Sequence, residues 1–284
     1  MKSVNEELPN VFNLAAYLIE GNLSTEHNDR IAFHTRLGTY TYAQVNSLVK
    51  RSAQLLSDLG IEQENRVSII LENEPEWVFF FLGAIWLGAV PVPINPTCSM
   101  KDIGYILQDS RSKVLLTTQT WQKEIVSLPL DYLHHTLLVD GATPFLSSRK
   151  DISELVPHAQ TSPHEPAFWL YTSGSTGRPK GVIHAHQSFL SCVQNYGQST
   201  IGLNQDDITY SVASMAFAYG LGNSLYLPMA MGAASVLSAT KSAFDIVDDV
   251  KRYQPTVFFG IPSIYADLLE VEDISNFDSS CLRL

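Results

Sequence analysis

The stretch AFWLYTSGSTGRPKG, residues 167–181, joins an apolar run to a hydroxyl- and glycine-rich turn that ends on Lys180. The apolar part, residues 167–172, predicts a buried strand. Glycines in the turn allow backbone angles closed to other residues and let amide groups approach a ligand. The hydroxyls and the lysine ammonium can donate to phosphate oxygens. A strand leading into such a turn is typical of α/β proteins that bind a polyphosphate.

Two other interpretations of this turn are weaker. A serine- and glycine-rich run can be a plain surface loop, but here an apolar strand precedes it and Pro179-Lys180-Gly181 ends it. A Walker A loop needs its lysine directly after the last glycine, whereas Lys180 comes three residues after Gly177, which disfavours a kinase or motor ATPase. The candidate phosphate-binding residues are therefore Thr172, Ser173, Gly174, Ser175, Thr176, Gly177 and Lys180.

Residues 171–181 resemble the phosphate-loop signature of the acyl-adenylate-forming (AMP-binding) superfamily. This superfamily includes acyl-CoA synthetases, nonribosomal peptide adenylation domains and firefly luciferase. Residues 40–42 and 81–94 also look like these enzymes, so the resemblance covers nearly the whole chain. Within the superfamily the sequence is most similar to benzoate-CoA ligases, as judged from residues 168–173, 217–223 and 255–262.

The resemblance implies a two-step reaction that uses ATP, Mg²⁺ and CoA. The carboxylate of the acid attacks the α-phosphate, and the CoA thiol then displaces AMP, while the loop holds the β- and γ-phosphates. The groups for adenine, ribose and the catalytic lysine are expected beyond Leu284, so no catalytic residue is assigned. The resemblance thus implies an N-terminal fragment that is inactive alone. A non-catalytic ATP-binding or remnant protein, and an adenylation unit loading a carrier protein, stay open as alternatives.

The segment Phe217, Ala218, Tyr219 and Gly220 is the candidate acid pocket. It is expected between a strand that ends near Ser214 and a helix that begins near Leu221. Strand ends are where open α/β sheets build ligand crevices. An aromatic wall beside alanine and glycine predicts a slot for a small aromatic acid such as benzoate. The alternative is that both aromatic residues are core.

The rest of the chain alternates between strand and helix patterns, which predicts an α/β fold with largely parallel sheets. A proline-containing polar stretch at 147–166 suggests two α/β subdomains, 1–160 and 161–284, the second truncated and with no C-terminal domain after it. The expected strands are 66–71, 90–94, 113–117, 167–172, 181–184, 207–212, 233–237 and 256–259. The expected helices are 76–87, 102–108, 187–196 and one that begins at Thr41, where Gln44 completes a capping box.

Composition narrows the function. The 284 residues carry a formal charge of −11, which argues against nucleic acid or an anionic membrane as partner. No targeting segment or membrane-spanning run is evident, so the chain is expected in the cytoplasm, with its three cysteines as free thiols. His184 and His186 have no third ligand nearby, so no metal site is predicted. Asp245, Asp248 and Asp249 are expected on a solvent-exposed helix face.

Overall fold

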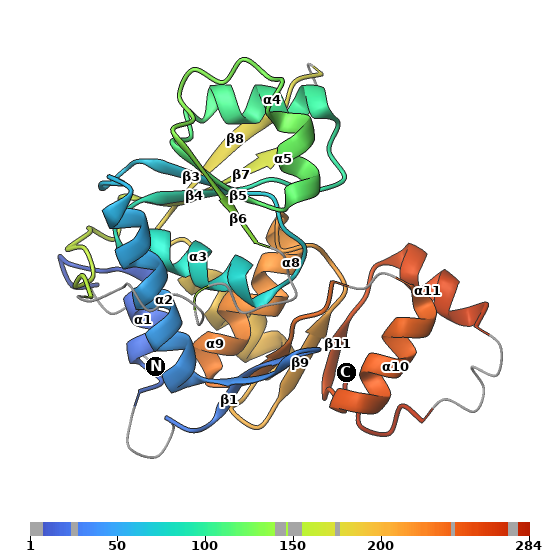
Figure 1. Ribbon diagram of the computed structural model, residues 1–284. Helices are drawn as coiled ribbons and strands as arrows, with labels where there is room; N and C mark the ends of the chain where they lie inside the picture. The colour runs from blue at the N-terminus through green and yellow to red at the C-terminus, as the bar shows by residue number, and fades with distance from the viewer. Residues whose placement is uncertain are drawn as a thin grey trace.

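The computed structural model describes residues 8–23, 28–139, 146, 155–173, 177–239, 242–271 and 278–284. Two β-sheets are stacked, with helices between them and on their outer faces (Figure 1). Most strand pairs in both sheets are parallel. The α/β class predicted from the sequence is confirmed.

The first sheet is parallel throughout its described strands, in the order β4-β3-β5-β6. These strands are β3 (Arg66–Ile69), β4 (Val90–Pro93), β5 (Val114–Thr117) and β6 (His135–Leu138). The helices between them are α3 (Pro75–Trp86), α4 (Met100–Asp109) and α5 (Gln119–Ile125). All residues of β4 and β5 are buried, as expected of parallel strands covered on both faces. An antiparallel hairpin, β7 (Pro166–Thr172) and β8 (Lys180–Ala185), lies beside β4.

The second sheet has the order β11-β9-β10-β1-β2 and takes strands from both ends of the chain. They are β1 (Ile31–Thr35), β2 (Gly38–Thr41), β9 (Ile208–Ser211), β10 (Ala234–Val236) and β11 (Val257–Phe259). β1 pairs with β10 in parallel, through Phe33 opposite Ser235. This sheet therefore combines β1 and β2 with strands that follow residue 160, and β7 lies beside β4 of the first sheet.

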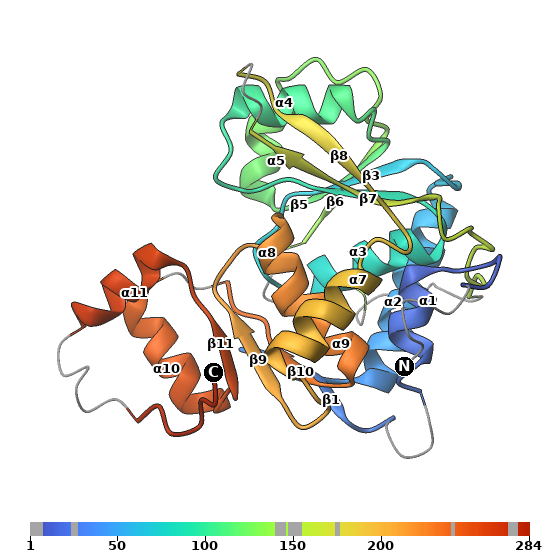
Figure 2. The same cartoon turned by 180° about the vertical axis from the view of Figure 1, so that it is seen from behind.

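Helices fill the space between the two sheets (Figures 1 and 2). The middle layer holds α1 (Leu14–Glu20), α2 (Tyr42–Asp58), α3, α7 (Leu190–Cys192), the π-helical turn η1 (Val193–Ile201), α8 (Ala218–Leu221), the π-helical turn η2 (Gly222–Tyr226) and α9 (Leu227–Met231). α4 and α5 cover the outer face of the first sheet. α10 (Ala243–Tyr253) and α11 (Pro262–Leu269) lie at the outer side of the second sheet.

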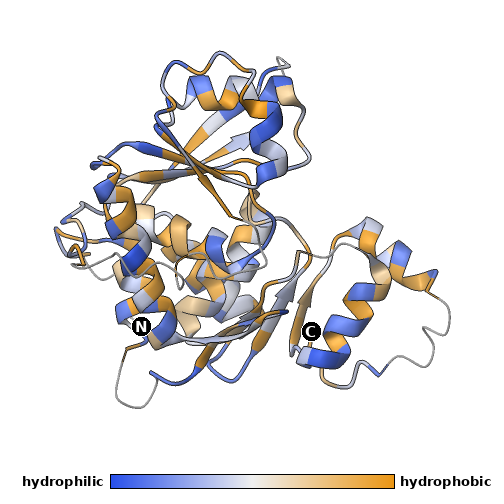
Figure 3. Cartoon of the chain, in the orientation of Figure 1, coloured by the Kyte–Doolittle hydropathy of each residue, from blue (hydrophilic) through white to orange (hydrophobic). Residues whose placement is uncertain are grey.

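Three hydrophobic clusters correspond to these layers. The largest lies in the middle layer, the second joins α4 and α5 to the first sheet, and the third joins α10 to β9 and β10. Apolar residues accordingly concentrate in the strands and the middle helices, while the outer helices also carry hydrophilic residues (Figure 3). Burying one large apolar side chain contributes about 1.5–3 kcal/mol, so the middle layer dominates the stability.

The helix predicted to begin at Thr41 is α2, and its capping box is present. The Thr41 hydroxyl accepts from the Gln44 amide at 3.2 Å, and the Gln44 side chain accepts from the Thr41 amide at 2.8 Å. Two of the free amides at the helix start are thereby satisfied. Further along, the Ser52 hydroxyl contacts α3 through the Phe79 carbonyl at 2.5 Å. The two helices are so close there that a Cβ on Gly83 would lie 1.9 Å from the Ser52 oxygen.

Two expectations about helices were wrong. Asp249 is buried, because its Oδ2 accepts from the Tyr210 hydroxyl at 3.0 Å and from the Ser238 hydroxyl at 2.7 Å. It therefore belongs to the packing of α10 on the sheet, while Asp248 is exposed as predicted. The helix expected at 187–196 begins instead at Leu190, in α7, and continues as the wider turns of η1 to Ile201.

The last described segment, 278–284, lies along β11. The Phe258 amide donates to the Leu284 carbonyl at 2.9 Å, and the Arg283 amide donates to the Thr256 carbonyl at 2.8 Å. Arg283 also makes a bidentate pair with Asp207, with distances of 2.8 and 2.7 Å. The hydrogen bonds from Arg283 and Thr256 hold the pKa of Asp207 below its usual value, despite its burial.

No helix within the described ranges is both long and apolar enough to cross a membrane. Cys98, Cys192 and Cys281 are free thiols and partly buried.

His186 fixes the start of α1 from a distant part of the chain. The Asn13 side chain accepts from the amides of Ala15 and Ala16 at 3.1 and 3.2 Å, and the Leu14 amide donates to Nδ1 of the buried His186 at 3.0 Å. A protonated imidazole could not accept this bond. Burial lowers the pKa of His186 to about 4, which the charge of Glu165 offsets only in part.

We expect His186 to make the fold sensitive to acid. Its neutral form contributes fully above the unfolded pKa of 6.5, and that contribution is lost as the pH falls toward the folded pKa of about 4. Between about pH 7.5 and about pH 5 the free energy of unfolding should fall by about 2 kcal/mol through this residue. In His186→Asn, whose side-chain oxygen can accept from Leu14, the decline measured by urea unfolding should be smaller by that amount. Parallel pH curves for the two proteins would contradict the assignment.

Candidate functional site

The candidate phosphate loop is the turn between β7 and β8. Thr172 and Lys180 form the last cross-strand pair before the turn, so the two ends of the loop are held together. Thr172, Ser173, Gly177 and Lys180 are all exposed. Gly177 has φ of +82°, a conformation that favours glycine, and an added Cβ would meet no described atom within 4 Å. Gly174, Ser175 and Thr176, also predicted for this site, lie outside the described residues.

The hairpin that presents the loop is held by buried side chains along β7. Phe168 is buried against Phe81 of α3, with ring centres 5.5 Å apart. On the facing strand His184 stacks on Phe168 with ring centres 4.6 Å apart and planes within 8°. The apolar strand pattern recognised in the sequence thus corresponds to aromatic packing of β7 against α3 and β8.

Lys180 is the cation best placed in this loop for a phosphate. Its side chain is exposed, and it takes part in none of the ion pairs found between described residues. The exposed Arg178 lies two residues before it on the same arm. An unpaired ammonium beside two hydroxyl-bearing residues can neutralise phosphate charge without first breaking an internal salt bridge.

The predicted acid-pocket residues lie at the start of α8. The preceding strand ends at Ser211 and the helix begins at Ala218, three residues earlier than expected, with Phe217 as its first flanking residue. Phe217 and Tyr219 are 46% and 43% exposed, which argues against the alternative that both are core residues. The Tyr219 hydroxyl donates to the Gly260 carbonyl at 3.2 Å.

Gly220 is buried beneath these aromatic residues, where the backbone approaches very closely. A Cβ added to Gly220 would lie 2.2 Å from the Ser214 carbonyl oxygen and 2.6 Å from that of Ala213. The glycine therefore lets the first turn of α8 pack onto the loop that precedes it. Whether residues 217–220 contact an acid is still a prediction.

Asn73 is a residue of this region that the sequence analysis missed. It is buried just beyond β3, and its side chain donates to the Ala213 carbonyl and accepts from the Met215 amide, both at 2.9 Å. It thereby ties the end of the first sheet to the segment that leads into Phe217. Its position directly after a buried strand was the available signal, since polar residues at strand ends commonly serve sites.

Where the structure describes them, the two sets of candidate residues lie apart. In both views α8 lies between the sheets, whereas the end of β7 and the start of β8 lie beside α4 (Figures 1 and 2).

His184 and His186 do not form a metal pair. His184 stacks on Phe168, and Nδ1 of His186 is occupied by the Leu14 amide. Across the described part of the chain no three His, Cys, Asp or Glu residues are grouped to hold a metal ion.

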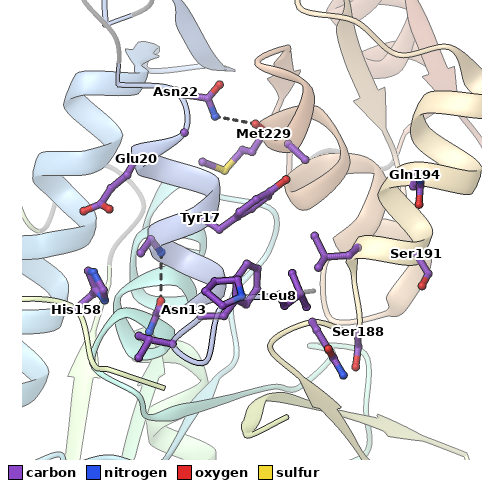
Figure 4. Close-up of a pocket in the computed structure, with 18 of the residues that line it drawn as sticks. Leu8, Asn13, Tyr17, Glu20, Asn22, His158, Ser188, Ser191, Gln194 and Met229 are labelled. Carbon is purple, nitrogen blue, oxygen red and sulfur yellow. Dashed lines mark hydrogen bonds between the residues drawn. The ribbon is translucent and has the colours of Figure 1, made fainter. Parts of the chain in front are cut away.

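A pocket of about 1220 Å³ opens elsewhere, between α1, η1 and α9 (Figure 4). Asn22 bridges it by donating to the Met229 carbonyl at 2.8 Å. Tyr17, Ser188, Ser191 and Gln194 line its wall. Among the lining residues that the structure describes there is no lysine or arginine, and none from the candidate loop or from 217–220. Its chemistry does not suit a polyphosphate.

These features define a class of protein: a two-sheet α/β protein in which a turn with a lysine and hydroxyl groups follows a strand. The pattern of the family described as AMP-binding enzyme matches residues 22–284, and the chain belongs to this family. The resemblance read from residues 171–181 is thereby confirmed.

Similar proteins include several aryl-CoA ligases. The chain is 34% identical over 267 residues to the 4-hydroxybenzoate-CoA/benzoate-CoA ligase of Rhodopseudomonas palustris, covering 91% of this chain and 49% of that enzyme. It is 32% identical over 276 residues to the benzoate-CoA ligase of Thauera aromatica, covering 94% and 52% respectively. The crystal structure of the anthranilate CoA ligase AuaEII in complex with anthranoyl-AMP matches with a TM-score of 0.92 and 31% identity, covering 100% of this chain and 55% of that one. The chain therefore spans about half the length of these relatives.

The close approach at Gly220 yields a test of the acid-pocket segment. Gly220→Ala should lower the free energy of unfolding by about 3 kcal/mol, since the new methyl group would overlap backbone atoms that cannot move aside easily. Gly104→Ala in α4 is the matched control, because its methyl group would meet only the flexible Leu128 side chain at 3.2 Å. Denaturant unfolding should place the control within about 1 kcal/mol of wild type, because alanine favours a helix. Equal effects of the two substitutions would contradict the close packing.

Proposed function

We propose that this chain supplies the ATP-phosphate-binding and acid-binding half of an aryl-CoA ligase. The observation that carries the proposal is Lys180, which is exposed and forms no ion pair with a residue that the structure describes. It ends a hydroxyl- and glycine-containing turn in a member of the AMP-binding enzyme family. The names of the similar ligases, which act on benzoate, hydroxybenzoate or anthranilate, support an aromatic acid as substrate.

In this proposal the loop receives the β- and γ-phosphates of ATP. Thr172 and Ser173 donate from one arm, Lys180 donates from the other, and Gly177 lets the backbone approach. Mg²⁺ accompanies ATP and neutralises further phosphate charge when bound. Catalysis would come from orienting the acid carboxylate toward the α-phosphate and stabilising the charge that moves onto pyrophosphate.

The aromatic ring of the acid would lie against Phe217 and Tyr219. Both rings are nearly half exposed, so they have surface left to bind a ligand. Ala218 adds little bulk between them. An edge-to-face contact with a bound ring contributes about 0.5–1.5 kcal/mol beyond simple burial. The AuaEII complex, which holds an aromatic acyl-adenylate, supports an intermediate of this kind.

CoA is the proposed thiol acceptor, because the similar enzymes are named CoA ligases. The resemblance implies that the groups for adenine, ribose and the thioester step follow this part of the sequence in such enzymes. We therefore propose that the 284 residues alone bind ATP but form no acyl-CoA.

The role of Lys180 is tested by nucleotide binding. Lys180→Ala should weaken the binding of Mg-ATP to the chain by about 10- to 100-fold, the loss of one charge-assisted hydrogen bond. Lys101→Ala is the control, since it removes an exposed lysine from α4 in the same part of the fold. Isothermal titration calorimetry measures all three proteins. Equal affinities for wild type and Lys180→Ala, or no binding by wild type, would refute the proposed site.

The acid specificity is tested in a hybrid in which this chain replaces the matching half of the Thauera aromatica benzoate-CoA ligase. Benzoate and 4-hydroxybenzoate should exceed cinnamate and octanoate in kcat/KM, measured as pyrophosphate release. Ala218→Leu should reduce kcat/KM for the benzoates about tenfold, because the added side chain fills the space for the ring. A hybrid that prefers octanoate, or an Ala218→Leu variant that affects all acids alike, would contradict the aromatic slot.

A further inference from the structure

The candidate phosphate loop is tied to α4 through its incoming strand. Tyr171, directly before Thr172, is buried and donates its hydroxyl to Oδ2 of Asp109 at 2.6 Å. Burial and the Asp109 carboxylate both raise the pKa of Tyr171, so its hydroxyl stays protonated and donating. The Tyr171 ring also lies against Gly181 of the facing strand, where an added Cβ would be 3.2 Å from Cζ.

The return arm of the loop reaches the same helix. The Arg178 guanidinium lies 5.7 Å from the centre of the Tyr105 ring, within range of a cation–π contact. Tyr105 and Asp109 are four residues apart on α4 and therefore share a face. The Tyr105 hydroxyl donates to Oδ1 of Asp109 at 3.4 Å. Both arms of the loop are thus held by one turn of one helix.

Asp109 places a carboxylate close to the candidate phosphate loop. A negative charge near a polyphosphate site repels the ligand. Asp109 is exposed at the end of α4, yet it bonds the residue that immediately precedes the loop. The negative charge of Asp109 has a physical reason if its short hydrogen bond to Tyr171 sets the direction in which the loop leaves β7.

We propose that Asp109 and Tyr105 are positioning residues for the phosphate loop. By holding Tyr171 and Arg178 they keep both arms oriented so that Thr172, Ser173 and Lys180 face the same ligand. This inference rests on the proposed function, in which those groups bind ATP. Neither positioning residue touches the nucleotide. Each residue raises the fraction of molecules in which the loop has the conformation that binds ATP. The apparent Kd for ATP rises as that fraction falls.

The test uses the 284-residue chain, with Mg-ATP and inorganic pyrophosphate as probes. Asp109→Ala and Tyr171→Phe each remove the anchoring bond, whereas Asp109→Asn keeps an oxygen that can accept it. Asp58→Ala is the matched control, because Asp58 is likewise the last residue of a helix and accepts from the residue four positions before it, Gln54, at 2.8 Å. Calorimetry gives the affinities, and hydrogen exchange of peptides within 171–182 reports on the hairpin.

Asp109→Ala and Tyr171→Phe should bind both probes about tenfold more weakly, as expected if the competent fraction falls to about a tenth. Exchange in the hairpin should become faster in both. Asp109→Asn should bind within about threefold of wild type, and Asp58→Ala should match wild type in both measurements.

Three results would overturn the inference. The first is unchanged affinity in Asp109→Ala, even with a lower melting temperature, which would mean a structural role only. The second is tighter binding in both Asp109→Ala and Asp109→Asn, which would mean that the carboxylate merely repels the ligand. The third is unchanged exchange in the hairpin. A wild-type chain that binds no ATP would refute the proposed function, and the exchange measurement would still decide whether Asp109 holds the loop.

Discussion

The complete burial of α3 is the constraint on which the rest of the structure depends. Each of its residues, from Pro75 to Trp86, is shielded from solvent. A helix that is hydrophobic all round must have protein on every side. α2 packs against it at the Ser52–Gly83 contact, the first sheet covers another side, and the second sheet closes the layer from below. The parallel pairing of β1 with β10 places an early strand of the chain in this second sheet.

The two sheets enclose a common apolar layer, so the polar candidate residues lie at the edges and strand ends of the sheets. The candidate phosphate loop projects from the hairpin beside the first sheet, and the segment around Phe217 leaves the second sheet at a strand end. Side chains contributed from elsewhere hold them, as Asn73 does for Met215 and Asp109 does for Tyr171. The proposed binding residues are therefore exposed, and side chains from other elements, the buried Asn73 and the exposed Asp109, orient the segments that carry them.

The positive charge that a small anionic substrate needs is found in one small region of the protein, the candidate phosphate loop. A chain of net charge −11 gives no general attraction for polyanions. Lys180 and Arg178 sit on one exposed arm of the turn, where their field is not neutralised by an ion pair among the described residues. The proposed affinity for ATP thus depends on a few short-range donors rather than on the whole surface.

The amino-acid sequence by itself determined the local features of this protein. The Thr41–Gln44 cap, the buried strands, the apolar helix at 75–86 and the phosphate-loop signature all follow from neighbouring residues, whose preferences act within a few positions. Tertiary structure alone decided the strand order, the burial of Asp249 and the packing that Gly220 permits. It also decided that Asp109 meets Tyr171, 62 positions away. Such contacts depend on how distant elements stack, because the free energy of burying the middle layer, and no local pattern, brings them together.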